Sequence, residues 1–181
     1  MANAEPKILQ NPPTKTHKFL LLLQIFLRAS VMAASLASTS LIVTNKETTL
    51  VFGIPVQAKY SYSPSFKFLA IANAFAASFT LLSLVFTLIA SRRGITPGNY
   101  FFFFLHDLAM MSLVLAGCAA ATAVGYLGKN GDSHAGWLPI CNYLDKFCKR
   151  MTTATVTSYL SLILLLSLTI ISATRSREIQ V

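Results

Sequence analysis

Two opposite charges stand inside long apolar stretches of this 181-residue chain: Arg28 in the first stretch and Asp107 in the third. A charge at the bilayer centre costs about 2.5–3.5 kcal/mol on insertion scales, so such residues usually face the interior of a helix bundle. An arginine can meet a carboxylate through two parallel hydrogen bonds, which offsets much of that cost. We therefore expect an intramembrane ion pair, supported by the neighbouring polar side chains of Gln24 and His106.

Counting along the chain places the two charges at similar depth. Arg28 comes nine residues after Phe19, and Asp107 comes seven residues after Tyr100, which is roughly 13 and 10 Å at 1.5 Å per helical residue. Both helices would cross the membrane in the same direction, so the two side chains can meet. We predict a structural ion pair that fixes which helices face each other. A proton or ion relay through the same residues is the alternative.

The elements that must position this pair follow from composition and hydropathy. Hydrophobic residues make up 54% of the chain and charged residues 12%, which is typical of an integral membrane protein. Each of four apolar stretches holds about 20 or more residues, enough to cross a hydrocarbon core of roughly 30 Å as a helix. The predicted fold class is an all-α membrane protein, a four-transmembrane-helix bundle.

The predicted segments follow the apolar stretches. They are a disordered N-terminal tail (1–18), one transmembrane domain (19–173) with helices at about 19–43, 68–90, 100–124 and 154–173, outer loops at 44–67 and 125–153, an inner loop at 91–99, and a C-terminal tail (174–181). Residues 48–60 are rich in strand formers and interrupted by Gly53 and Pro55, so a short β-hairpin is expected in the first outer loop.

The orientation in the membrane follows from charge and cysteine placement. An even number of crossings puts both termini on one side. Seven Lys or Arg residues fall on each side, but those beside the termini are packed into shorter segments, which favours a cytoplasmic location. Cys141 and Cys148 share the longest loop and could close an eight-residue ring in an oxidising compartment. We predict a disulfide outside the cytoplasm, with two free thiols as the alternative.

No arrangement of residues points to catalysis. The two loop cysteines are too far apart for a Cys-x-x-Cys redox pair, and there is no phosphate-binding loop or Gly-x-Ser-x-Gly elbow. His17, His106 and His134 are too separated to predict a metal site. We expect no catalytic residue, metal or cofactor.

Charge and small residues indicate the partners. The net charge of +9 is scattered over tails and connections, so lipid headgroups rather than nucleic acid are the expected counter-charge. Two stripes of small residues are candidates for helix packing, either within one bundle or between subunits. They are Gly117, Ala121 and Gly125 in the third helix, and Ala29, Ala33 and Ala37 in the first.

Several motifs resemble those of the plant Casparian strip membrane domain protein-like family, subfamily 1 type, which is related to the MARVEL four-helix group. The motifs are Phe26-Leu27-Arg28-Ala29, Ala58-Lys59-Tyr60, Ser63-Pro64-Ser65-Phe66-Lys67-Phe68, Ile71-Ala72-Asn73-Ala74, His106-Asp107 and the two loop cysteines. The resemblance covers most of residues 18–175. It matches Arg28 and Asp107 to the intramembrane arginine and aspartate of the family.

This resemblance implies a non-enzymatic scaffold of the plasma membrane, multi-pass, that self-associates and forms heteromers with paralogues. In the founding members such a platform excludes other proteins and recruits enzymes that modify the cell wall. The segment Glu47–Gly53 lacks the acidic-to-aromatic signature of those members, so the resemblance is to the broader group and not to a Casparian strip role. An alternative from another class is a small channel or transporter subunit that uses Arg28 and Asp107.

Overall fold

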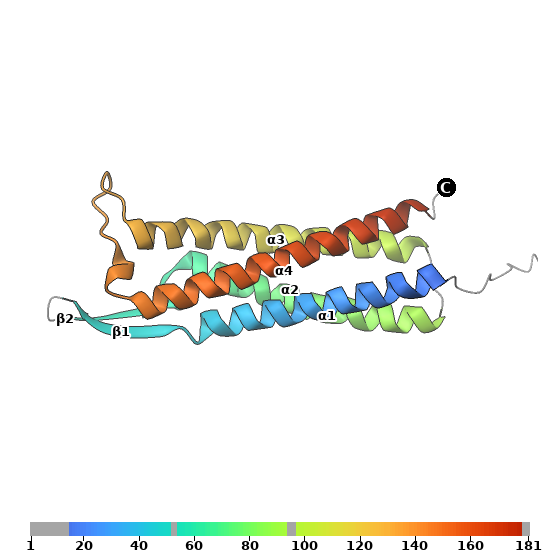
Figure 1. The fold of residues 1–181 in the computed structure, drawn as a ribbon, viewed down its shortest axis with the longest axis horizontal. Coiled ribbons are helices and arrows are strands. Elements are labelled where there is room, and N and C mark those ends of the chain that lie inside the picture. Colours follow the sequence, from blue (N-terminus) through green and yellow to red (C-terminus); the bar gives the residue numbers. More distant parts are fainter. Residues whose placement is uncertain (1–14, 52–53, 94–96, 179–181) are drawn as a thin grey trace, which may run out of the picture.

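Four long helices form an antiparallel bundle in the computed structural model, which describes residues 15–51, 54–93 and 97–178 (Figure 1). The helices are α1 (Lys15–Val43), α2 (Pro64–Arg93), α3 (Pro97–Asn130) and α4 (Asp145–Glu178). Each contains a segment long and apolar enough to cross a membrane. The predicted four-helix membrane class is therefore confirmed.

The helices extend beyond the apolar stretches from which they were predicted. α1 begins four residues before Phe19, α3 continues to Asn130 and α4 begins at Asp145. Hydropathy marks the part of a helix that can lie in lipid, whereas backbone hydrogen bonding continues into polar residues. The connection between α3 and α4 is consequently 131–144, whereas the loop was predicted at 125–153. The rest of the predicted N-terminal tail (1–14) and the last three residues lie outside the described residues.

The predicted hairpin is present at the end of the bundle where α1 ends and α2 begins (Figure 1). Strand β1 (Lys46–Val51) pairs antiparallel with β2 (Ile54–Lys59), with Lys46 directly opposite Lys59. A 3-10 turn, η1 (Tyr60–Tyr62), leads into α2. Pro64 is the first residue of that helix, a position where the N–H that proline lacks would have no helical partner.

The connection between α3 and α4 is short and cross-linked. Gly131 closes the last turn of α3 at φ +68°, and its N–H donates to the Leu127 carbonyl at 2.8 Å. After a 3-10 turn, η2 (Ile140–Asn142), the Cys141–Cys148 disulfide joins the connection to the first turns of α4, with 5.7 Å between the two Cα atoms. This confirms the predicted disulfide in place of two free thiols.

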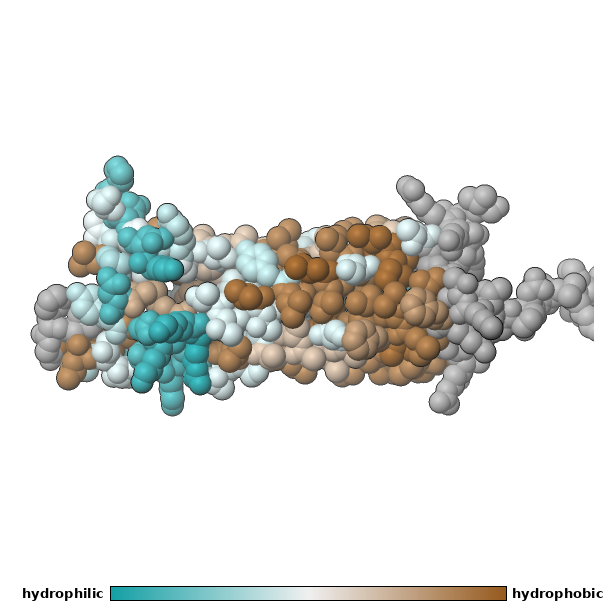
Figure 2. Space-filling view, in the orientation of Figure 1, coloured by the Kyte–Doolittle hydropathy of each residue, from teal (hydrophilic) through white to brown (hydrophobic). Residues whose placement is uncertain are grey.

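The bundle core receives apolar side chains from all four helices. Val31, Leu69, Val114 and Leu165 are among its fully or almost fully buried members. Large hydrophobic side chains also cover the outside, as the brown surface in Figure 2 shows, while hydrophilic atoms gather at the hairpin end. An apolar exterior of this extent suits contact with lipid rather than water.

Candidate functional site

Arg28 of α1 and Asp107 of α3 meet inside the bundle through two hydrogen bonds. The Arg28 Nη1 atom donates to Asp107 Oδ1 at 3.0 Å, and Nη2 donates to Oδ2 at 2.9 Å. The arginine side chain is 2% exposed and the aspartate 0%. The pair expected from the sequence is thus a two-pronged contact, enclosed by protein on all sides.

Serine hydroxyls from the other two helices complete this contact. Arg28 Nη1 also donates to Ser83 Oγ of α2 at 2.5 Å, and Ser172 Oγ of α4 donates to Asp107 Oδ2 at 3.4 Å. The Phe103 ring lies 5.0 Å from the guanidinium carbon, close enough for a cation–π contact. Each helix therefore contributes one polar side chain to a cluster that we call the clasp: Arg28, Ser83, Asp107 and Ser172.

The two supporting residues expected from the sequence behave differently. His106 Nδ1 lies 3.2 Å from Asp107 Oδ1, and the imidazole packs against the Phe79 ring at 5.8 Å between centroids. Gln24 is buried one turn before Arg28, but within the described part of the chain no hydrogen bond joins it to the clasp. Of these two residues, only His106 lies within hydrogen-bonding distance of the ion pair in that part of the chain.

Ser83 and Ser172 were not among the site residues predicted from the sequence. Serine is common in apolar helices, and its type alone does not show which way it faces. One signal was available for α2, because Thr80, Ser83 and Thr87 recur at three- and four-residue spacing and so share one helix face. All three are buried.

A second polar cluster, the serine layer, lies closer to the hairpin end. It consists of Ser35 and Ser38 of α1, Asn73 of α2, and Ser158 and Ser161 of α4, all fully buried. Hydroxyl pairs Ser35–Ser161 and Ser38–Ser158 each lie at 2.7 Å, and Asn73 Nδ2 donates to Ser158 Oγ at 2.9 Å. Interhelical hydrogen bonds of this kind stabilise packing where lipid supplies no hydrophobic drive.

The predicted small-residue stripe of α3 divides into two parts. A Cβ added to Gly117 would lie 3.1 Å from Leu69 Cδ1 of α2, and Ala121 is 2% exposed, so both belong to the bundle interior. A Cβ added to Gly125 would meet nothing within 4 Å. Gly117 and Ala121 thus serve packing within one chain, whereas Gly125 stands outside that contact.

The alanine stripe of α1 faces the opposite way. Ala33 and Ala37 are exposed and Ala29 is half-buried, because the interior face of α1 is occupied by the clasp and the serine layer. Small side chains at such exposed positions are typical of sites where another helix approaches closely.

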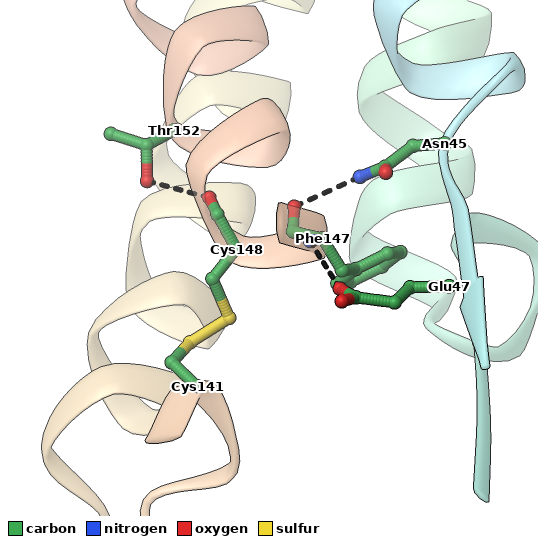
Figure 3. Close-up of a disulfide and its surroundings, with 6 residues drawn as sticks. All are labelled: Asn45, Glu47, Cys141, Phe147, Cys148 and Thr152. Carbon is green, nitrogen blue, oxygen red and sulfur yellow. Dashed lines mark hydrogen bonds between the residues drawn. A yellow bond between two sulfur atoms is a disulfide. The ribbon is translucent and has the colours of Figure 1, made fainter. Parts of the chain in front are cut away.

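At the hairpin end, two polar side chains attach the first outer loop to α4 (Figure 3). Asn45 Nδ2 donates to the Phe147 carbonyl at 2.9 Å, and the Phe147 N–H donates to Glu47 Oε2 at 2.6 Å. That N–H lies in the first turn of α4, where no helical carbonyl is available to it. The Phe147 ring also packs edge-on against Phe66 of α2, with 6.2 Å between centroids.

Comparison with known proteins assigns the family. The sequence profile of the Casparian strip membrane protein domain matches residues 17–164. CASP-like protein 1F2 of Populus trichocarpa is 55% identical, with all of both chains covered. CASP-like protein 1F1 of Vitis vinifera is 50% identical, over all of this chain and 88% of the relative. The chain belongs to the CASP-like membrane protein family. No solved structure matches it significantly.

For a CASP-like protein, the arrangement of the clasp indicates structural chemistry. The hydrogen bonds among Arg28, Ser83, Asp107 and Ser172 all join one helix to another. Among the described residues, no group of three His, Cys, Asp or Glu side chains is placed to hold a metal ion. The clasp thus joins all four helices of this CASP-like chain through side-chain hydrogen bonds.

Proposed function

We propose that this protein is a non-enzymatic scaffold of the plasma membrane, with both termini in the cytoplasm, that associates with itself and with paralogous chains to build a membrane domain. Recruitment of proteins that modify the cell wall would be the output of that domain. The single observation that carries the proposal is membership of the CASP-like family over the full chain.

The distribution of polar groups supports the same function. Within the bundle, the charged and hydroxyl side chains of the clasp bind one another. The surface left for other chains is the apolar exterior, the outer α1 face with Ala33 and Ala37, and the loops at the hairpin end. A rigid bundle that presents fixed surfaces is what a scaffold requires.

The orientation in this proposal rests on the disulfide. Disulfides such as Cys141–Cys148 form and persist in oxidising compartments, and α1 begins and α4 ends at the other end of the bundle (Figure 1). These two observations support cytoplasmic termini.

Self-association is tested with a matched pair of variants. Ala33→Leu/Ala37→Leu places two large side chains on the outer α1 face, whereas Ala116→Leu/Ala123→Leu makes the same change at exposed positions of α3. We expect the α1 variant to recover faster after photobleaching in the plasma membrane and to lose co-purification of a differently tagged copy, while the α3 variant behaves like wild type.

Wild-type protein that diffuses freely and captures neither its own copies nor a paralogue would contradict the scaffold function. Reconstitution in liposomes provides a second, independent test. An ion flux that disappears in the Asp107→Asn variant would assign the protein to the channel class instead.

A further inference from the structure

A surface cavity of about 490 Å³ opens at the hairpin end between the start of β1 and the first turns of α4. We call it the cationic cavity. The residues that line it are Asn45, Lys46, Glu47, Lys146, Lys149 and Arg150. Four of these six side chains are cations and one is a carboxylate. Figure 2 shows the hydrophilic surface of the bundle at this end.

The positive charge of this cavity is poorly compensated within the protein. Its one carboxylate, on Glu47, accepts the Phe147 N–H, and Lys149 pairs with Asp145 at 2.8 Å. Across the described ranges 15–51, 54–93 and 97–178, no carboxylate lies within 4.0 Å of the other three cations, Lys46, Lys146 and Arg150.

The hairpin register places a second lysine opposite Lys46, one of the cations of the cavity. Lys46 stands directly opposite Lys59 in the antiparallel pair, so both side chains leave the same face of the hairpin. Like charges in this relation are destabilising. An anion bound beside Lys46 would relieve the repulsion both within the hairpin and toward α4.

The position of the cavity selects the kind of anion. The apolar span of α1 ends at Val43, two residues before Asn45 of the cavity lining. A bilayer whose hydrocarbon core covers this span would bring its headgroups to the level of the cavity. From the cavity, one exposed face of α4 continues along the helix toward the bilayer centre. Its members, spaced three or four residues apart after Lys149, are Thr153, Val156, Leu160 and Ile163.

We propose that the cationic cavity binds the phosphate of an anionic phospholipid in the leaflet at the hairpin end, with an acyl chain along the exposed α4 face. A soluble polyanion could use the four cations, but it would gain nothing from the apolar face beneath them. A phospholipid can contact both parts of this surface, the cations with its phosphate and the apolar α4 face with its acyl chain. This site is independent of the scaffold function, because it requires neither a second copy nor a partner protein.

Native mass spectrometry of the detergent-purified full-length protein tests the site. Titration with phosphatidylglycerol and, separately, with phosphatidylcholine measures lipid retention. The cavity variant Lys146→Gln/Arg150→Gln removes two unpaired cations and keeps the Asp145–Lys149 pair. The matched control Lys67→Gln/Lys129→Gln removes two exposed cations at the same end of the bundle but outside the cavity.

We expect wild type to prefer phosphatidylglycerol by about tenfold or more, since each cation near an anionic headgroup contributes about a fivefold gain. The cavity variant should lose most of this preference and the control should keep it. Lys46→Gln, on the hairpin side, should produce an intermediate loss. All these side chains are exposed, so the substitutions leave the core intact.

Three outcomes would overturn the proposal. Equal retention of the two lipids would show that the cavity does not select an anionic lipid. An equal loss of the preference for phosphatidylglycerol in the control variant would assign that preference to diffuse surface charge. Oligogalacturonate, a soluble polyanion, serves as a competitor in the same titration; tighter, cavity-dependent binding of this probe than of phosphatidylglycerol would assign the cavity to a soluble ligand.

Discussion

At the scale of single residues, the clasp concentrates the consequences of mutation in two side chains. Arg28 and Asp107 are both buried and bind each other in a bidentate manner. Removal of one partner leaves the other as an uncompensated charge, which is typically destabilising by about 3–5 kcal/mol, whereas exchange of both for apolar residues of similar volume can be nearly neutral. The effects of the two mutations on the free energy of unfolding should therefore be strongly non-additive.

We predict that Arg28→Ala and Asp107→Ala each lower the free energy of unfolding by about 3–5 kcal/mol and reduce the amount of protein at the cell surface. The double variant Arg28→Met/Asp107→Leu should lose less than the sum of the two. Thermal unfolding in detergent, followed by size-exclusion chromatography, measures the first effect, and surface labelling measures the second. Normal surface levels for either single variant would contradict the role of the clasp.

The sequence predicted this pair because charged residues within apolar stretches are rare and must find partners. It could not select Ser83 and Ser172 from the other serines of α2 and α4, because that choice depends on how each helix is rotated about its axis. Gln24 is the opposite case, a residue that the sequence selected wrongly as a partner of the pair. It lies on the correct face of α1 yet forms no hydrogen bond to the clasp within the ranges that the structure describes.

At the scale of elements, α2 and α3 approach closely where Gly117 faces Leu69. A Cβ at Gly117 would lie 3.1 Å from Leu69 Cδ1 and 3.3 Å from its Cα, whereas one at Gly125 would meet nothing within 4 Å. The second neighbour is backbone, so it cannot move aside without shifting α2. The two glycines therefore form a natural test and control within one helix.

We predict that Gly117→Val lowers the free energy of unfolding by about 1–3 kcal/mol through overpacking, while Gly125→Val has little effect. The helix propensity changes in the same way at both sites, so the difference between the two variants reports the contact with α2. Their melting temperatures in the same detergent provide the measurement. Equal melting temperatures would show that α2 and α3 are not in this register.

The hairpin is attached to α4 by a contact that the sequence did not indicate. The expected strands are present, but the Glu47–Phe147 hydrogen bond joins residues 100 positions apart, a proximity that no local pattern predicts. The same applies to the length of α4, whose polar first turns were predicted as loop. Hydropathy identifies the membrane spans well and says little about helix ends in the aqueous phase.

We predict that Glu47→Gln weakens this attachment by about 1 kcal/mol, the typical value of a helix N-terminal cap, because the amide is a poorer acceptor than the carboxylate. Amide hydrogen exchange should become roughly fivefold faster for the Phe147 N–H and for β1, with the bundle core unchanged. Thr48→Ala, at the exposed neighbouring position, is the control. Unchanged exchange at Phe147 would exclude Glu47 as its cap.

At the scale of the whole molecule, polar contacts follow the bundle axis. The clasp lies nearer the end where α1 begins and α4 ends, the serine layer lies nearer the hairpin, and the disulfide and cationic cavity occupy the hairpin end itself. The two ends therefore differ in chemistry, and only the hairpin end carries a covalent cross-link among the described residues. This asymmetry makes the orientation in the membrane measurable with native residues.

We predict that a membrane-impermeant maleimide labels intact cells at Cys141 and Cys148 only after treatment with an impermeant reductant, because the disulfide blocks both thiols until then. Cys118 should stay unlabelled in the folded protein, since its side chain is fully buried in α3, and Cys141→Ser/Cys148→Ser should abolish the signal. The opposite orientation would expose these two thiols to the reducing cytoplasm. Labelling that requires permeabilised cells and no reductant would therefore show that the bundle has the opposite orientation in the membrane, with its termini outside the cytoplasm.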